Sequence, residues 1–355
     1  MNIYVLNTSL NRVGIVDVFS SVIWTNRYYS CGDFELYLRA TPNLLNILQK
    51  DYYLIREGHE SNAMIIEAIQ LSTDAENGNY LTVKGRCLKS ILYRRIIWDM
   101  TTVSGTVEAC IATLLDNNAI SPTDVKRKIL NLFNVNEYKT SINMQAQYTG
   151  NNLGETIEAL CTQYEIGWDI KLDLENKKFS FYLYAGKDRT FRQKENSAVI
   201  FSDEYENLLT TTYTLDKSEY SNVAKVAGEG EGAARKNVTV GNESGLDRYE
   251  LFVDARDLSQ NSGDTQITDA EYNAQLQARG ERDLAEKIVK VNIEGEVEAN
   301  YTYRLNEDYF LGDIVEIRNE YGIAGVSRIT EIIESEDDSG MYTIPTFSAY
   351  TLKEG

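Results

Sequence analysis

Residues 33–39, Asp-Phe-Glu-Leu-Tyr-Leu-Arg, place an apolar side chain at every second position. Side chains of a β-strand point alternately to its two faces, so this stretch predicts a strand with one buried face. The only helix expected nearby begins at Thr41-Pro42 and runs through Leu48. Further strands are predicted at Arg12–Val18, Tyr52–Ile55, Met64–Leu71 and Tyr80–Gly85, the last two joined by a hairpin turn at Asn77-Gly78. Several short strands with one short helix indicate a small barrel or closed sandwich over residues 1–100.

Residues 101–205 are predicted to mix helices with a hairpin. A first helix follows from apolar residues at helical spacing within 107–115. Asn152 is placed to cap a second helix, with Glu155 at its third position, and Gly167 is expected to end that helix. Alternating residues at 168–174 and 179–183 then predict a hairpin.

Residues 206–355 are predicted to return to strands around an inserted segment and helix at about 240–288. The sequence Thr268-Asp269-Ala270-Glu271 matches a capping box, in which Thr and Glu satisfy each other's backbone donors. This helix is expected to run past Ile288, and Gly280 in its interior indicates a close packing contact. Strands are predicted at 289–293, 312–317 and 326–332.

The predicted fold class is therefore α+β and rich in β structure. Two small barrel-like domains, residues 1–100 and 206–355, are expected to flank a mixed helix and hairpin domain at 101–205. Gly32-Asp33 and Gly312-Asp313 each precede an alternating strand. This short internal match is compatible with two related β domains, although chance also produces such matches.

Charge is distributed unevenly along the 355 residues, whose formal net charge is −19. Residues 1–185 carry 20 acidic and 17 basic side chains, whereas residues 186–355 carry 34 and 18. No basic face for gripping phosphates is evident, which argues against a nucleic-acid-binding protein. The acidic run Glu331, Glu334, Glu336, Asp337 and Asp338 is interpreted as a solvated hairpin loop, since the spacing of a calcium loop is absent.

Chemistry-bearing motifs are scarce. The single histidine, His59, lies in a polar turn, which excludes a two-histidine metal site and disfavours a Ser-His-Asp triad. The four cysteines form no C-x-x-C pair, and Cys110 and Cys161 fall on the apolar stripes of predicted helices as buried thiols. The glycine-rich loop Gly228–Gly232 holds two glutamates, which would repel phosphate. The sequence thus predicts no catalytic, cofactor-binding or metal-binding residue, and no enzyme.

Apolar runs are too short for a membrane anchor, and no signal peptide is evident, so a soluble protein made in the cytoplasm is expected.

An ordered set of segments spanning nearly the whole chain resembles the siphophage tail hub family, whose fold is related to the baseplate hubs of contractile phages. The segments are Tyr29–Leu36, Met64–Glu67, Val83–Arg86, Leu92–Ile97, Tyr220–Val223, Arg248–Glu250, the helix at 272–284, Leu311–Val315 and Arg328–Glu331.

The resemblance implies a homotrimeric ring at the distal end of the tail tube, in which each subunit contributes two β-barrel domains. Six barrels would then match a hexameric tube. The implied partners are distal tail and tube proteins, a tape measure protein and a tail-tip or spike protein. DNA would pass through the channel without specific binding. From the charge distribution, the acidic excess of residues 186–355 is expected to face the channel or its distal opening, and an even spread of acid over the exterior for solubility is the open alternative. The protein would be assembled in the bacterial host cytoplasm and reside in the virion tail. Two alternatives stay open: a carbohydrate-binding module for host recognition, and a cell-wall glycosidase using an acidic pair.

Overall fold

The structure is a computed structural model that describes all residues except 77, 263–264, 298–301, 320, 322–323 and 350–355. The chain divides into two units, each assembled from separate segments. The first contains Met1–Ser90, Gly167–Thr214 and Val291–Gly355, and the second contains Ile91–Ile166 and Leu215–Lys290. The domain boundaries at residues 100 and 205 remain a prediction from the sequence.

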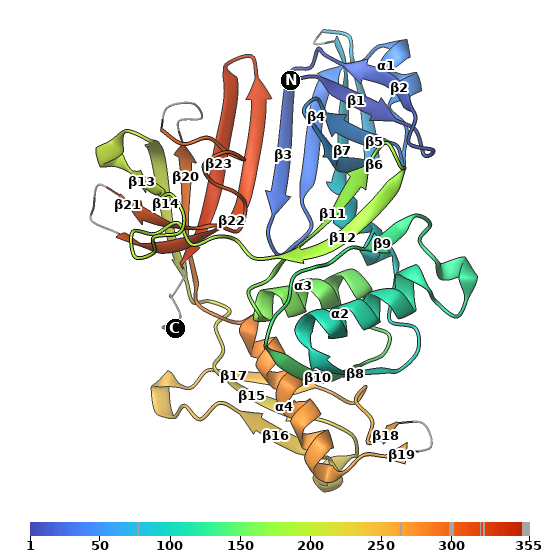
Figure 1. The fold of residues 1–355 in the computed structure, drawn as a ribbon, viewed down its shortest axis with the longest axis vertical. Helices are drawn as coiled ribbons and strands as arrows, with labels where there is room; N and C mark the ends of the chain where they lie inside the picture. Colours follow the sequence, from blue (N-terminus) through green and yellow to red (C-terminus); the bar gives the residue numbers. More distant parts are fainter. Residues whose placement is uncertain (77, 263–264, 298–301, 320, 322–323, 350–355) are drawn as a thin grey trace. The chain divides into compact units, whose positions relative to one another are not determined.

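Most strands of the first unit belong to one continuous sheet (Figure 1). Its N-terminal strands are β1 (Ile3–Leu6), β2 (Arg12–Val16), β3 (Ser21–Arg27), β4 (Asp33–Arg39), β5 (Tyr53–Arg56), β6 (His59–Asp74) and β7 (Gly78–Cys87). Its later strands are β13 (Ile200–Ser202), β14 (Leu208–Asp216), β20 (Lys290–Val297), β21 (Ile314–Arg318), β22 (Ala324–Asp337) and β23 (Gly340–Ala349). The unit also holds α1 (Pro42–Ile47) and the hairpin of β11 (Gly167–Asp173) and β12 (Lys178–Tyr184).

The prediction of two separate closed barrels is wrong for the described residues. Their strand order is β14-β20-β23-β22-β3-β4-β7-β6-β5-β1-β2, with β21 paired to β22 and β13 to β21, and this order does not close on itself. The reason is that β22 hydrogen-bonds to β3, so strands from the two ends of the chain continue one sheet. This pairing supplies hydrogen-bond partners to strand edges that would otherwise need barrel closure to be paired.

Two hydrophobic cores nevertheless form within this sheet. The first buries Phe34, Leu36 and Leu38, the apolar positions of the alternating stretch 33–39, together with residues of the other N-terminal strands. α1 packs Leu44 and Leu45 against it, and its cap is Thr41, whose hydroxyl accepts from the Leu44 backbone N–H at 3.2 Å. The second core lies among the later strands and contains Val199, Phe201, Leu208, Tyr309, Val315, Ile317, Ile329, Ile332 and Phe347. The N-terminal strands build the first core, whereas the second core also takes Val199 and Phe201 from the region predicted as the mixed domain.

Strand lengths differ from the expected ones. β6 is longer than the predicted 64–71 because it pairs with β7 out to Asp74↔Gly78. Asn77 of the predicted turn lies outside the described residues. Strands β1, β3, β13, β14 and β23 of this sheet are absent from the prediction.

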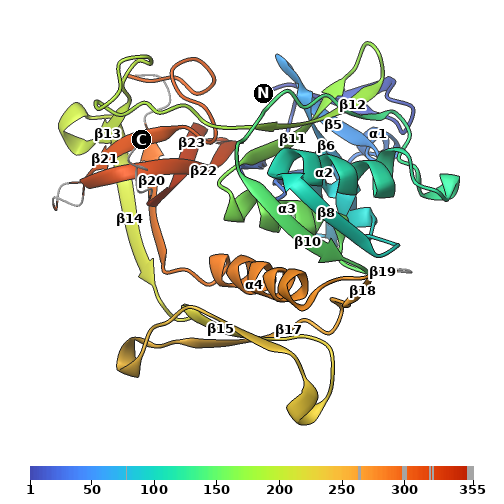
Figure 2. The ribbon, with the colours of Figure 1, turned by 60° about the horizontal axis from the view of Figure 1, so that its bottom comes forward.

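The second unit consists of two layered parts. One part pairs β8 (Thr101–Thr106) with β10 (Asn143–Tyr148) and carries α2 (Val107–Leu115) and α3 (Leu153–Gln163); it also includes the short strand β9 (Leu132–Asn134). The other part is a sheet of β15 (Val223–Ala227), β16 (Asn237–Val240) and β17 (Glu250–Asp254), with α4 (Asp269–Ala285) lying along one face (Figure 2). A small hairpin of β18 (Asn261–Ser262) and β19 (Thr265–Gln266) precedes α4.

The local signals that start the helices are confirmed, and the predicted ends of two helices are corrected. The Asn152 side chain accepts from the Glu155 backbone N–H at 3.2 Å, as predicted. Cys110 and Cys161 are buried on α2 and α3. α3 ends before Gly167, however, and that glycine opens β11 instead. A Cβ at Gly167 would lie 2.3 Å from Cε2 of Tyr28, so the position is glycine because an aromatic ring packs on its backbone.

The capping box of α4 is formed as predicted. The Thr268 hydroxyl accepts from the Glu271 N–H, and the Glu271 carboxylate accepts from the Thr268 N–H. The helix ends at Ala285 rather than past Ile288, which is exposed and gains no burial by continuing it. The contact inferred at Gly280 exists: an added Cβ would lie 2.6 Å from Val226 Cγ2 and 2.7 Å from Val240 Cγ2.

Gly280→Ala is therefore expected to destabilise the second unit. Alanine would gain about 1 kcal/mol of helix propensity over glycine. Overpacking against two β-branched residues costs about 1–3 kcal/mol, so the net free energy of unfolding should fall by about 1 kcal/mol. Urea denaturation followed by far-UV circular dichroism measures this change. Asn273→Ala, at an exposed position of the same helix, is the control and should change stability by less than about 0.5 kcal/mol. An increase in stability for Gly280→Ala would contradict the contact.

Candidate functional site: the corner where the two cores join

One edge of β22 connects the two halves of the sheet. Residues 324–328 of β22 pair with β21, whereas residues 331–337 pair with β3. β3 leads into β4 through Tyr28–Gly32, a segment that we call the corner. The corner lies where β22 changes partner, because the Tyr28 N–H donates to the Thr330 carbonyl at 2.9 Å. The two cores are joined along the whole β22–β3 ladder, and the corner lies at the end of that ladder where β22 also meets β21.

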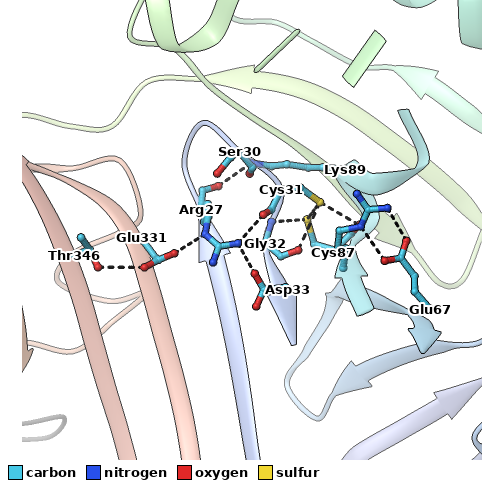
Figure 3. A network of polar contacts seen from close by, with 11 residues as sticks. Arg27, Ser30, Cys31, Gly32, Asp33, Glu67, Cys87, Lys89, Glu331 and Thr346 are labelled. Carbon is cyan, nitrogen blue, oxygen red and sulfur yellow. Dashed lines mark hydrogen bonds and ion pairs between the residues drawn. The ribbon is translucent and has the colours of Figure 1, made fainter. Parts of the chain in front are cut away.

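Arg27, the last residue of β3, lies directly before the corner and carries the charge around which its polar contacts gather (Figure 3). Its guanidinium donates to Glu331 of β22, to Asp33 of β4, and to the Cys31 carbonyl at 2.8 Å. The Thr346 hydroxyl donates to the other oxygen of Glu331 at 3.3 Å, which extends the network to β23. Burial by itself would lower the pKa of Arg27, but the hydrogen bond with Asp33 and the charge of Glu331 outweigh it and raise that pKa. Arg27 thus holds three strands together as a permanent cation.

Lys89 stabilises the backbone of the corner by hydrogen bonds. Its side chain is buried, and its ammonium donates to the carbonyls of Arg27 at 2.7 Å, Ser30 at 3.0 Å and Tyr28 at 3.4 Å. The same ammonium lies 4.9 Å from the ring centre of Trp168. An ammonium has three N–H groups, and here they point to three backbone carbonyls. Lys89 therefore fixes the backbone of the turn through these hydrogen bonds.

Tyr28 anchors the corner to the C-terminal region. The residue is fully buried, and its hydroxyl donates to the Tyr184 carbonyl at 3.3 Å. Its ring rests on Gly312, where an added Cβ would lie 2.2 Å from Cε2. The Arg328 guanidinium lies 5.3 Å from the ring centre. The two Gly-Asp sequences are thereby brought to the same corner, since Gly32 belongs to it and Gly312 packs under it.

The second Gly-Asp sequence builds a buried ion pair. Asp313 accepts from Arg189 Nε at 2.5 Å, from the Lys187 N–H at 2.7 Å and from the Phe310 N–H at 3.0 Å. A carboxylate that accepts three donors compensates much of the desolvation that burial imposes on its charge.

Only part of the acidic run is the solvated hairpin loop that its composition suggests. Asp337 ends β22 and Asp338 lies in the turn to β23, and both are exposed. Glu331, Glu334 and Glu336 lie within β22 itself, and each has a cationic partner from the N-terminal strands. Glu331 pairs with Arg27, and Glu334 accepts from Arg56 of β5 at 2.7 Å. Glu336 accepts from the N-terminal ammonium at 2.8 Å. Charge density in the sequence indicated solvent exposure, but the partners are about 280 residues or more away and leave no local signal.

Arg56→Met is expected to lower the free energy of unfolding by about 3 kcal/mol, because it leaves Glu334 partly buried without its cation. The Arg56 side chain is only 3% exposed. The double variant Arg56→Met/Glu334→Leu should recover much of the loss, since a hydrophobic pair of similar volume often replaces a buried ion pair without cost.

Lys84→Met is the matched control for this experiment. The Lys84–Glu35 pair spans two strands of the same sheet, but Lys84 is 55% exposed. Its removal should cost less than about 1 kcal/mol in the same chemical denaturation assay. Equal decreases in the free energy of unfolding for Arg56→Met and Lys84→Met would show that the buried Arg56–Glu334 pair stabilises the fold no more than the exposed pair does.

The other sequence-predicted features lie apart from the corner. His59 is exposed as expected, but it is the first residue of β6 and pairs with Arg56, so the turn itself consists of Glu57 and Gly58. The loop Gly228–Gly232 joins β15 to β16, and Arg235 donates to the Gly228 carbonyl at 2.9 Å and pairs with Asp254. That arginine is engaged with its own backbone rather than presented to a phosphate. Within the described part of the chain, no cluster of three or more potential metal ligands occurs.

The first unit also contains a cleft of about 360 Å³. Its walls include Tyr182, Tyr184, Asn62, Asn306 and Asp169. Burial, and then the neighbouring Asp169, raise the pKa of Tyr182 above its usual range, so its hydroxyl remains a neutral donor.

Comparison with known proteins assigns this fold. A tail protein from Neisseria meningitidis MC58 matches with a TM-score of 0.57 and 12% identity, covering 98% of this chain and 95% of that one. The 43 kDa tail protein of prophage MuSo2 from Shewanella oneidensis matches with a TM-score of 0.55 and 13% identity over 98% of both chains. The prophage tail protein gp18 from Listeria monocytogenes EGD-e gives 0.55 and 16%, covering 99% and 96%. No curated protein matches the chain in sequence.

The fold is thus that of phage and prophage tail proteins, with the corner joining its two β cores. The chain belongs to the family of Siphovirus ReqiPepy6 Gp37-like proteins, whose model matches residues 2–347. The resemblance to siphophage tail proteins is therefore confirmed by the family and by the fold. No helix among the described residues is both long and apolar enough to cross a membrane.

Proposed function

We propose that three copies of this chain form a ring-shaped hub at the distal end of the tail tube. Its neighbours would be tube and distal tail proteins, a tape measure protein and a tail-tip or spike protein. DNA would pass through the ring without specific binding, and the protein would have no catalytic activity of its own. It would be assembled in the host cytoplasm and remain in the virion tail.

The observation that carries this proposal is the presence of two β cores in one unit, joined edge to edge through β22. Three subunits would supply six such cores, which suits contact with a hexameric tube. The acidic excess of residues 186–355 would face water in the channel or at its opening, because like charges between subunits would repel. An acidic wall would also keep DNA phosphates from binding.

An exposed apolar edge further supports assembly. β2 is the terminal strand of the sheet order, and Val13 and Ile15 on it are more than one third exposed. Val18, just after it, is 78% exposed. Unpaired strand edges that carry apolar side chains promote association with another chain. A neighbouring subunit would cover this edge in a ring.

Light scattering and negative-stain imaging of the purified chain test the proposal. The expected particle is a threefold ring with three times the 40.3 kDa mass of one chain. Val18→Asp should weaken the ring, whereas Leu246→Asp, at a 97% exposed position of the second unit, should leave it intact. The absence of a threefold ring both in the purified protein and in assembled tails would contradict the proposal.

A carbohydrate-binding role is the second candidate, and the 360 Å³ cleft is the observation that favours it. Tyrosine rings beside amide and carboxylate groups are suited to stacking on a sugar and hydrogen-bonding its hydroxyls. Glycan-array binding that is lost in Asn306→Ala and retained in the ring-disrupting Val18→Asp variant would support this role over the hub.

A further inference from the structure

Two cysteines that are far apart in the sequence meet at the corner. Cys31 belongs to the corner itself, and Cys87 is the last residue of β7. Their sulfur atoms lie 3.4 Å apart (Figure 3). The sequence spacing gave no indication of this pair, because the contact depends on the pairing of β4 with β7.

The backbone holds the two residues in register. The Cys87 N–H donates to the Gly32 carbonyl at 2.9 Å, and the Gly32 N–H donates to Cys87 Sγ at 3.2 Å. A disulfide bond requires a separation of about 2.0 Å between sulfurs, so the pair must approach by a little more than one ångström. Small rotations about the two Cα–Cβ bonds supply a movement of that size while the backbone hydrogen bonds persist.

The surroundings favour one thiolate in the pair. Burial raises the pKa of Cys87, but the hydrogen bond from Cys31 and the positive charge of Lys89 outweigh it, so the pKa of this thiol lies below its usual value. The hydrogen bond with Cys87, followed by burial, raises the pKa of Cys31. The pair therefore loses its first proton from Cys87, which is the form that attacks a disulfide.

Solvent exposure distinguishes this pair from the other two cysteines. Cys31 and Cys87 are each partly exposed, whereas Cys110 and Cys161 are buried in the second unit. Thiol oxidation selects sites that combine thiolate character with exposure.

We propose that Cys31 and Cys87 form a reversible disulfide bond when the protein meets a small disulfide such as oxidised glutathione. The Cys87 thiolate attacks one glutathione sulfur and releases one glutathione thiolate. The Cys31 thiol then loses its proton, attacks Cys87 Sγ and displaces the second glutathione thiolate. The two released thiolates take up the two protons, so that two protein thiols are oxidised and one glutathione disulfide is reduced.

The cross-link would tie the corner to β7 by a covalent bond. Closing a loop of more than fifty residues restricts the unfolded chain and favours the folded one. In a virion, the bond would be absent during assembly in a reducing cytoplasm and would form after release. That timing rests on the proposed function, whereas the chemistry of the pair does not.

The test uses the full chain, reduced with a phosphine and transferred to buffers of oxidised or reduced glutathione. After denaturation, iodoacetamide labelling and peptide mass mapping identify the remaining thiols. In the oxidised buffer, we expect a cross-linked peptide pair containing Cys31 and Cys87, with Cys110 and Cys161 fully labelled. The melting temperature should rise by several degrees on oxidation and return on reduction.

Cys31→Ser should abolish both the cross-link and the rise in melting temperature, and Cys110→Ser should retain them. Labelling of all four cysteines in the oxidised buffer would overturn the proposal, as would glutathione adducts without a protein cross-link. If the chain forms the disulfide but no threefold ring is found in the purified protein or in assembled tails, the trimeric hub is contradicted and this inference stands.

Discussion

Gly312→Ala is expected to lower the free energy of unfolding of the first unit by about 3 kcal/mol or more. Gly312 has φ of +96°, a backbone conformation that an alanine adopts only with strain. The new methyl group would also overlap the ring of Tyr28, which is fully buried and fixed through its hydroxyl. Neither the ring nor the backbone can retreat without breaking the corner.

Gly325→Ala is the matched control, because Gly325 lies in β22 and an added Cβ meets no atom within 4 Å. This variant should change stability by less than about 0.5 kcal/mol. Amide hydrogen exchange in β22 and β3, together with urea denaturation, measures both variants. If Gly312→Ala and Gly325→Ala behave alike, the packing of Tyr28 on Gly312 does not stabilise the junction.

The helix caps show what local sequence can predict. Asn152 and the capping box at Thr268 act within four residues, so the same signal that specifies them is visible in the sequence. The alternation of residues 33–39 also predicts its buried face correctly. These features depend on backbone groups and neighbours that are close along the chain.

The pairing of β3 with β22 could not be predicted in the same way. β3 reads Ser-Val-Ile-Trp-Thr-Asn-Arg, in which apolar residues are adjacent rather than alternating, and its partner β22 lies about 300 residues away. Glu331, Glu334 and Glu336 therefore appeared as a cluster of unpaired charges. Only the long-range register places an arginine or an ammonium opposite each of them. Sequence reasoning thus predicts some of the strands at both ends, without β1, β3 or β23, and does not predict the pairing that joins the two ends.

Asp313→Ala is expected to lower the free energy of unfolding by about 3–5 kcal/mol, because it removes one partner of a buried ion pair. The Asp313 side chain is 2% exposed, and Arg189 would be left as a buried cation without its carboxylate. The Lys187 and Phe310 backbone N–H groups would also lose their acceptor. Asp313→Asn keeps the shape and one acceptor oxygen, so its loss should be smaller than that of the alanine variant.

The first Gly-Asp sequence supplies the control for the second. Asp33→Ala removes a carboxylate that also follows a glycine and also pairs with an arginine, but Asp33 is 46% exposed and its pair is open to solvent. Its loss should cost less than about 1 kcal/mol, because water and Glu331 still satisfy Arg27. Chemical denaturation of the two alanine variants therefore compares the same sequence motif at two degrees of burial. Suppose instead that Asp33→Ala lowers the free energy of unfolding strongly and Asp313→Ala lowers it little. The Arg27 network, and not the Asp313 pair, would then be the main stabilising interaction.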